Sequence, residues 1–311
     1  MNRRSKGIHK RRTKAQTPVE RKTAVEVTIP TLQKARRVGH PPMLRSKHGV
    51  PILLGVPFDG ESSYLRGAAD APPKIREALA CDASNQSTET GIDLGGDGIY
   101  EDAGDLEFSS EDAFASIEDA VGKLMNGGKR PVSLGGDHSI TYPILKAVAR
   151  KHSGLTIFHF DAHPDLYDEF EGNRFSHACP FARIMEGELA RRLVQVGIRT
   201  LNSHQRQQAT RFGVEVIEMR NLPAYASLKA AGPAYISFDM DVLDPAYAPG
   251  ISHREPGGMS VREAIAHLHA IQAEIVGADL VEYNPLRDIS GTTATVAAKI
   301  LKEILGKMIA G

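Results

Sequence analysis

Acidic and imidazole side chains gather at three points of the sequence, each directly after a short apolar run. They are Asp137 and His138 in VSLGGDHS, Asp161, His163 and Asp165 in DAHPD, and Asp239 and Asp241 in SFDMDVLDP. Side chains two residues apart in a strand point to the same face, so Asp161 and His163 are expected to project together, and so are Asp239 and Asp241. Carboxylates held this close raise one another's pKa and oppose folding unless cations compensate their charge. The pattern therefore predicts a site for two divalent metal ions.

The predicted ligand set of two imidazoles and four carboxylates is hard and rich in oxygen. Such a set favours Mn²⁺ over the Zn²⁺ of thiolate sites, with Ni²⁺, Co²⁺ and Fe²⁺ as alternatives. Two ions about 3.5–4 Å apart would share a water molecule and lower its pKa, which creates a nucleophile for hydrolysis. A lone DxD or Gly-Gly-Asp-His segment is more often a loop or a cap. Three clusters, each at the end of an apolar strand, favour the metal site instead.

Apolar runs alternate with helical patterns beyond residue 50, which is typical of βαβ units in a mostly parallel sheet covered on both faces. We expect strands at 51–57, 131–135, 155–161, 193–198, 214–219, 234–241 and 275–283, and helices at 73–80, 113–125, 142–151, 203–212, 261–273 and 294–309. Ser260 and Glu263 predict a capping box before one of these helices. Ligands of such sheets bind beyond the carboxyl ends of the strands, which is where the three clusters lie.

Charge divides the chain of 311 residues near residue 50. Residues 1–49 hold 14 of the 38 Lys and Arg but 2 of the 38 Asp and Glu, which leaves 24 basic and 36 acidic residues in 50–311. We expect residues 1–49 to form a basic, disordered arm and residues 50–311 to form one catalytic domain. Organelle targeting and nucleic-acid binding are the alternative roles of the arm, and we expect no nucleic-acid partner.

The two cysteines, Cys81 and Cys179, lie far apart in the sequence and make no disulfide framework. This favours a reducing compartment, and the cytoplasm is the expected location, with organelle targeting as the alternative. No apolar run approaches the roughly 18–20 residues of a membrane span, and no signal-peptide pattern is present. We therefore expect no membrane partner.

The three clusters resemble the metal-binding signatures of the ureohydrolases, the family of the arginases and agmatinases. Four further segments resemble the plant-type arginases: SSYLRGAADAPPKIREAL, EGNRFSHACPFARIMEG, APGISHREPGGMSVREA and VEYNPLRD. The resemblance runs from about residue 50 to the end and implies a single three-layer α/β/α domain. It also implies that two Mn²⁺ ions are bound, with Asp239 and either Asp161 or Asp165 as bridging ligands. The six implied ligands are His138, Asp161, His163, Asp165, Asp239 and Asp241.

The resemblance further implies a reaction, the hydrolysis of a guanidino C–N bond by a metal-bridging hydroxide. His177 occupies the position of the proton shuttle, for which the usual pKa of histidine near 6.5 is suitable. Glu282 occupies the position that pairs with the guanidinium. Asn173 and Ser176 lie where arginases bind the α-carboxylate of arginine, and His253 is a further candidate for substrate contact. Taken alone, His177 would more often be a surface histidine, and Glu282 part of a structural ion pair.

The leading interpretation is an Mn²⁺-dependent arginase that converts L-arginine to L-ornithine and urea. Agmatinase, which converts agmatine to putrescine and urea, is the first alternative, and a hydrolase of guanidinobutyrate or guanidine is the second. A non-catalytic subunit is the alternative from another class, but it predicts a broken ligand set, whereas all six ligands are present. The family implies a homo-oligomer, either a trimer or a hexamer.

Overall fold

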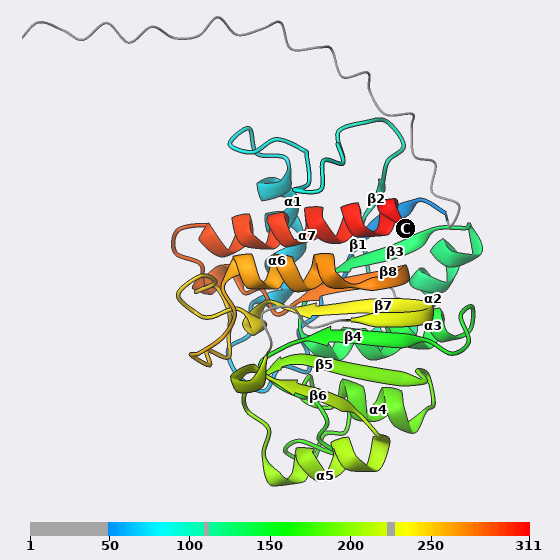
Figure 1. Cartoon of the computed structure of the whole chain (residues 1–311), viewed down its shortest axis with the longest axis vertical. Helices are drawn as coiled ribbons and strands as arrows, with labels where there is room; N and C mark the ends of the chain where they lie inside the picture. Colours follow the sequence, from blue (N-terminus) through cyan, green and yellow to red (C-terminus); the bar gives the residue numbers. More distant parts are fainter. Residues whose placement is uncertain (1–48, 109–111, 223–227) are drawn as a thin grey trace, which may run out of the picture. The chain divides into compact units, whose positions relative to one another are not determined.

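The computed structural model describes residues 49–108, 112–222 and 228–311. Their centre is an eight-stranded sheet, parallel throughout, in the order β2-β1-β3-β8-β7-β4-β5-β6 (Figure 1). The strands are β1 (Pro51–Gly55), β2 (Glu101–Asp105), β3 (Arg130–Leu134), β4 (Thr156–Phe160), β5 (Arg192–Ile198), β6 (Glu215–Glu218), β7 (Lys229–Asp239) and β8 (Gln272–Val281). The predicted arm lies outside the described residues, apart from Gly49.

Helices cover both faces of the sheet, as the sequence predicts. They are α1 (Ala71–Leu79), α2 (Ala113–Asn126), α3 (Thr141–Ala149), α4 (Pro180–Glu186), α5 (Ser203–Phe212), α6 (Val261–Ala270) and α7 (Thr292–Ala310). One apolar core lies between the sheet and α1, α6 and α7, and a second lies between the sheet and α2, α3, α4 and α5. Figure 1 shows α6 and α7 side by side across the sheet. Among the described residues, no helix is long and apolar enough to cross a membrane.

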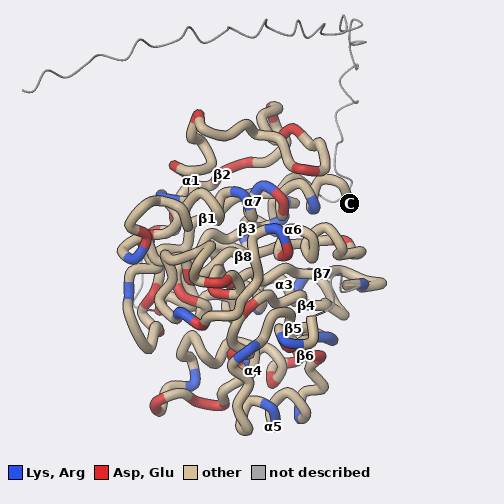
Figure 2. The backbone as a smooth tube through the Cα atoms, turned by 60° about the vertical axis from the view of Figure 1, so that its left-hand side comes forward, with Lys and Arg blue, Asp and Glu red and all other residues tan. Residues whose placement is uncertain are grey.

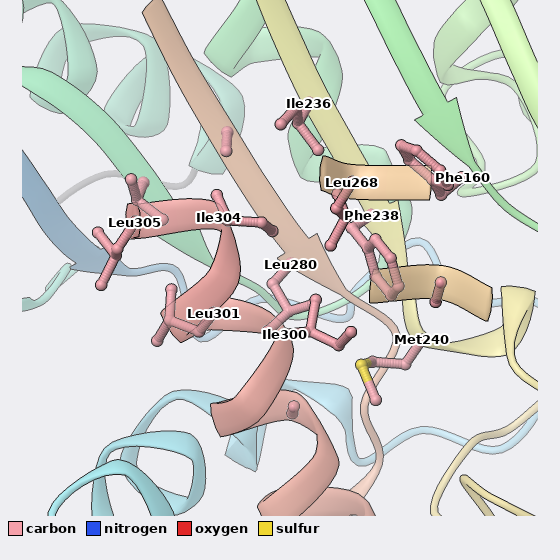
Figure 3. Packing of buried hydrophobic residues seen from close by; sticks show 14 of the residues in the cluster. Phe160, Ile236, Phe238, Met240, Leu268, Leu280, Ile300, Leu301, Ile304 and Leu305 are labelled. Carbon is pink, nitrogen blue, oxygen red and sulfur yellow. The ribbon is translucent and has the colours of Figure 1, made fainter. Parts of the chain in front are cut away.

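Apolar strands fix the centre of the sheet. Every residue of β4, with the sequence TIFHF, is buried, as expected for a strand of a parallel sheet with helices on both sides. Figure 3 shows how the first core is filled: Ile300 of α7 lies next to Leu280 of β8, and Leu268 of α6 lies over Phe238 of β7. Burial of a large apolar side chain contributes about 1.5–3 kcal/mol to stability, so this packing holds the strand ends in place.

The predicted strands and helices are all present, and one further strand and one further α-helix were not predicted. Strand β2 has the sequence EDAGD and is exposed at every position, so it carries no apolar signal. Its backbone pairs with β1, and Arg76 binds the carboxylates of Asp102 and Asp105 at its two ends. Helix α4 is only 7 residues long and begins at Pro180. The capping box of Ser260 and Glu263 is confirmed at the start of α6.

The four strands β3, β8, β7 and β4 are neighbours, and their carboxyl ends meet at one edge of the sheet. The first predicted cluster follows β3, the second follows β4, the third lies at the end of β7, and Glu282 follows β8 directly. Figure 2 shows several acidic positions (red) gathered in the middle of the tube. The topology therefore brings together charged residues that are far apart in the sequence.

Candidate metal centre and active site

One imidazole nitrogen, Nδ1 of His138, faces three carboxylates. It lies 3.1 Å from Oδ2 of Asp161, 3.1 Å from Oδ2 of Asp165 and 3.1 Å from Oδ2 of Asp239. All four residues are buried, and Nδ1 has no hydrogen-bond partner among the described residues. Ligand atoms about 2.1 Å from one octahedral ion lie about 3 Å apart at adjacent corners. The three distances from Nδ1 therefore fit a shared divalent ion.

A second set of candidate ligands adjoins the first. Nδ1 of His163 lies 2.9 Å from Oδ2 of Asp241 and 3.5 Å from Oδ1 of Asp161. Asp161 thus presents one oxygen to each histidine, Oδ2 to His138 and Oδ1 to His163. Of the two bridging alternatives left open by the sequence, Asp161 has this geometry. The structure brings all six predicted ligands into two adjacent sets.

Two of the buried acids are poorly stabilised in their ionised form. Burial, together with the charges of Asp241 and Asp161, raises the pKa of Asp239 well above its usual value of 3.8. Burial also raises the pKa of Asp241. Divalent cations between these oxygens would reverse both effects, because a nearby positive charge favours the ionised form. The donor chemistry and the electrostatics therefore agree with the geometry.

A chain of hydrogen bonds that starts at Nε2 orients the ring of His138. Its Nε2 lies 3.0 Å from Oγ of Ser237, which donates to Oδ1 of Asp279 at 2.7 Å. Asp279 also accepts from the hydroxyls of Tyr235 and Thr141. Because the hydroxyl proton of Ser237 points to Asp279, its oxygen accepts the Nε2–H of His138. The three carboxylates outweigh burial and raise the pKa of His138 well above 6.5, so a bound metal ion would replace the proton on Nδ1 while Nε2 keeps its own.

Ser237→Ala should therefore weaken metal binding. We expect a loss of affinity of about 10–100-fold, because the tautomer and orientation of His138 are no longer fixed. Competition with a chelating dye measures the affinity. The matched control is Ser133→Ala, since Ser133 is a fully buried serine on β3 whose hydroxyl has no hydrogen-bond partner among the described residues. Equal metal affinities of the two variants would contradict the proposed role of Ser237 in orienting His138.

Asp161 has a support of its own, which the sequence analysis missed. Nε2 of His159 donates to Oδ2 of Asp161 at 2.7 Å, and Gln195 donates to Nδ1 of the same ring at 3.1 Å. The ring stacks on Phe181 with centroids 3.8 Å apart. Burial lowers the pKa of His159, so the ring stays neutral and orients the carboxylate. A histidine in the middle of an otherwise apolar strand was the available signal.

His177 and Glu282 form a buried pair at the same strand ends. Nδ1 of His177 lies 2.8 Å from Oε1 of Glu282, which also accepts the backbone N–H of His138 at 2.9 Å. Burial alone would lower the pKa of His177 and raise that of Glu282. Burial is the largest single effect, but the attraction between the two groups and to their charged neighbours together outweighs it, raising the pKa of His177 to about 9 and lowering that of Glu282 to about 2. At neutral pH the pair is an imidazolium and a carboxylate.

Two acids of the site have unusual backbone conformations. Glu282 has φ 62° and Asp165 has φ 50°, in the left-handed region that non-glycine residues rarely adopt. Such conformations persist where the surrounding structure fixes them, and they occur often at functional sites. Here they lie immediately after β8 and in the loop after β4, where each turns a carboxylate toward the site.

Glu282→Gln should lower the pKa of His177 by about 1–3, because the nearby negative charge is lost while burial remains. The pKa should fall because the carboxylate of Glu282 contributes to raising the pKa of His177 to about 9, whereas burial lowers it. Titration of the labelled histidine rings by NMR, in protein prepared without metal, gives both values. An unchanged titration midpoint for His177 would contradict the pairing.

A cavity of about 170 Å³ opens onto the candidate ligands. Its wall includes His163, Asp165, Asp239, Asp241, His177, His253 and Glu282 from the predicted site, together with Ser63, Tyr167, Phe170, Ala178, Thr200 and Gln205. The ring of His253 lies 5.0 Å from that of His177 and 6.0 Å from that of His163, centroid to centroid. No Lys or Arg belongs to this wall, so the lining formed by described residues suits a small cationic ligand.

Asn173 and Ser176 do not line this cavity, although the sequence analysis expected both at the substrate tail. Asn173 donates to Oε2 of Glu61 at 2.5 Å and accepts the N–H of Phe175 at 2.8 Å, so its amide organises a turn. Ser176 is only 3% exposed, and its Oγ accepts the N–H of Ala178 at 3.4 Å. The loop after β4 thus uses both residues for its own conformation.

Polar groups from β5 and α5 take part in the cavity wall instead. Thr200 follows β5, and Gln205 belongs to the first turns of α5. Sequence reasoning missed both of them. The signal for Thr200 was available, because a polar residue just beyond a parallel strand lies at the edge where ligands bind.

One protein-family model matches the segment of the chain that contains every residue of the site described above. The Arginase family model matches residues 51–306. Arginase 1, mitochondrial, from Arabidopsis thaliana is 48% identical over 274 residues, which cover 82% of this chain and 80% of that protein. Agmatinase from Bacillus subtilis (strain 168) is 35% identical over 263 residues, covering 82% and 90%. The solved arginase from Medicago truncatula matches with a TM-score of 0.79 at 46% identity, covering 84% of this chain and 88% of that one.

Proposed function

The chain belongs to the arginase family, and on that premise we propose that it is an Mn²⁺-dependent arginase that hydrolyses L-arginine to L-ornithine and urea. The observation that carries this proposal is the convergence of His138 with three carboxylates, each 3.1 Å from its Nδ1, beside a cavity lined by His177 and Glu282. The identity to the Arabidopsis arginase, 48%, against 35% to the Bacillus agmatinase, supports arginine over agmatine.

The six candidate ligands would hold two metal ions, with His138 and Asp165 at one position, His163 and Asp241 at the other, and Asp161 and Asp239 as the shared carboxylates that the family resemblance implies. When bound, such an ion pair supplies a hydroxide nucleophile at neutral pH. The set of imidazole and carboxylate donors contains no thiolate, which favours Mn²⁺, with Ni²⁺, Co²⁺ and Fe²⁺ as alternatives.

Glu282 gives the cavity a fixed negative charge for the guanidinium of the substrate. Its pKa of about 2 keeps it ionised throughout the neutral range. A carboxylate and a guanidinium match in shape and charge. Because no Lys or Arg lines the described cavity wall, only histidines, chiefly His177, compete there for this carboxylate.

His177 supplies the proton that the departing amine needs. Its ring is an imidazolium at neutral pH, since its pKa is about 9. Glu282 accepts a hydrogen bond from Nδ1 of this ring, so Nε2 is the nitrogen that exchanges protons. As the C–N bond of the substrate breaks, a proton from Nε2 reaches the amine nitrogen, so that it departs as a neutral amine.

The substrate is tested by urea release from L-arginine, agmatine, guanidinobutyrate and guanidine, with Mn²⁺ present throughout. We expect kcat/KM for L-arginine to exceed the others by about 100-fold or more, a ratio that polar contacts to a substrate tail can provide. An equal or higher kcat/KM for agmatine would make the protein an agmatinase. No urea from any of the four compounds would overturn the proposed function.

Location and assembly stay predictions of the sequence. The Arabidopsis relative is named as mitochondrial, which supports the organelle alternative for residues 1–49 over the cytoplasm. A fusion of residues 1–49 to a fluorescent protein decides between the two. Light scattering of the purified chain tests the predicted trimer or hexamer, and binding assays test the expected lack of nucleic-acid and membrane partners.

A further inference from the structure

A hydroxyl group lies at hydrogen-bond distance from the ring nitrogen of His177 that exchanges protons. Nε2 of His177 lies 2.8 Å from Oγ of Ser63, and both residues line the cavity. His177 is only 8% exposed, whereas Ser63 is exposed. The hydroxyl of Ser63 therefore lies between a buried ring nitrogen and the solvent that enters the cavity.

The loop of Ser63 is tied to the site on both sides. The N–H of Glu61 and the hydroxyl of Ser62 donate to Oδ2 of Asp137 at 3.0 Å and 3.2 Å. The backbone N–H of His177 donates to the carbonyl of Glu61 at 3.2 Å. Ser63 directly follows these anchors, so its hydroxyl keeps a fixed position relative to the imidazole.

We propose that Ser63 is a proton-relay residue that acts through His177, a role that rests on the proposed function. A serine hydroxyl can accept one proton and donate another at the same time. Because Glu282 occupies Nδ1 and Ser63 occupies Nε2, protons that enter or leave the ring from the cavity pass through the hydroxyl.

Each transfer balances without a further reactant. As the departing amine is protonated, the Nε2–H bond of His177 breaks and an O–H bond forms on Ser63. The original O–H bond of Ser63 breaks in the same step, and an N–H bond forms on the amine. His177 is then a neutral imidazole and Ser63 is again a neutral hydroxyl. The reverse transfers, with solvent as the proton donor, restore the imidazolium.

The test compares Ser63→Ala with Ser63→Thr in the full-length, metal-loaded protein. We expect Ser63→Ala to lower kcat for L-arginine about 10–100-fold, less than the complete loss of a general acid, with KM within about twofold. Added imidazole should restore kcat in proportion to its concentration, because a small buffer can replace the hydroxyl as proton carrier. Ser63→Thr keeps the hydroxyl and should keep the kcat of the wild type. Ser153→Ala, an exposed serine in the loop before β4, is the control.

Two results would overturn the relay while the proposed function stands. One is an active wild type with an unchanged kcat in Ser63→Ala and no response to imidazole. The other is an equal loss of kcat in Ser63→Ala and Ser63→Thr without rescue, which would make the role of Ser63 structural. A wild type that releases no urea from any guanidino compound overturns the function and the relay together. Metal content measured on every variant separates these outcomes from loss of the ions.

Discussion

We expect Asp161→Ala to lower urea release from L-arginine at least about 10³-fold, because several kcal/mol of metal-derived stabilisation of the transition state are lost. Asp161 is the acid that faces both ligand sets, 3.1 Å from Nδ1 of His138 and 3.5 Å from Nδ1 of His163. Its removal should therefore release at least one metal ion per chain. Metal analysis of the purified variant and a urea assay measure the two effects.

The matched control for this variant is Glu169→Ala. Glu169 is an exposed acid in the same loop, four residues beyond Asp165, and it does not line the cavity. It should keep both the metal content and the activity of the wild type. Full metal occupancy in Asp161→Ala would show that this carboxylate is not a ligand.

His177→Ala should separate proton transfer from metal binding. We expect kcat to fall about 10²–10⁴-fold, the usual contribution of a general acid, while the metal content stays that of the wild type. His177 contacts Glu282 and Ser63 through its ring nitrogens and is not among the six candidate ligands. Steady-state kinetics and metal analysis of the same preparation give both quantities.

His152→Ala is the control for the histidine variant, since His152 is partly buried in the loop before β4, outside the cavity wall. Its kcat should match that of the wild type. An unchanged kcat in His177→Ala would remove the proton-transfer role, and loss of metal in that variant would place His177 among the ligands instead.

The strands that position the site were predictable because they are buried on both faces. Such strands read as apolar runs, and β4 and β7 end directly at acidic residues. Strand β2 could not be found in this way, because EDAGD carries no apolar pattern and is exposed at every position. Its place in the sheet depends on backbone pairing with β1 and on Arg76, which is contributed by α1. Contacts of this kind leave no periodic pattern in the sequence.

The convergence of the candidate metal ligands was predictable for a related reason. The residues of each cluster are close together in the sequence and lie just beyond a strand. Each cluster can therefore be found by inspecting the end of a single predicted strand. The groups that support the ligands are not local: Ser237 is 99 residues from His138, and Ser63 is 114 residues from His177. Only the fold brings them together. Asn173 illustrates the same limit, because its hydrogen bond to Glu61, 112 residues away, draws its amide into a turn outside the cavity wall.

Metal stoichiometry measured together with activity is the most direct test of the central claim, that six side chains at the strand ends hold two divalent ions which enable hydrolysis of a guanidino group. We predict two manganese ions per chain in protein purified with Mn²⁺. Urea release should disappear when a chelator removes them and return in proportion to the Mn²⁺ restored. Undiminished urea release from protein without bound metal would contradict the account.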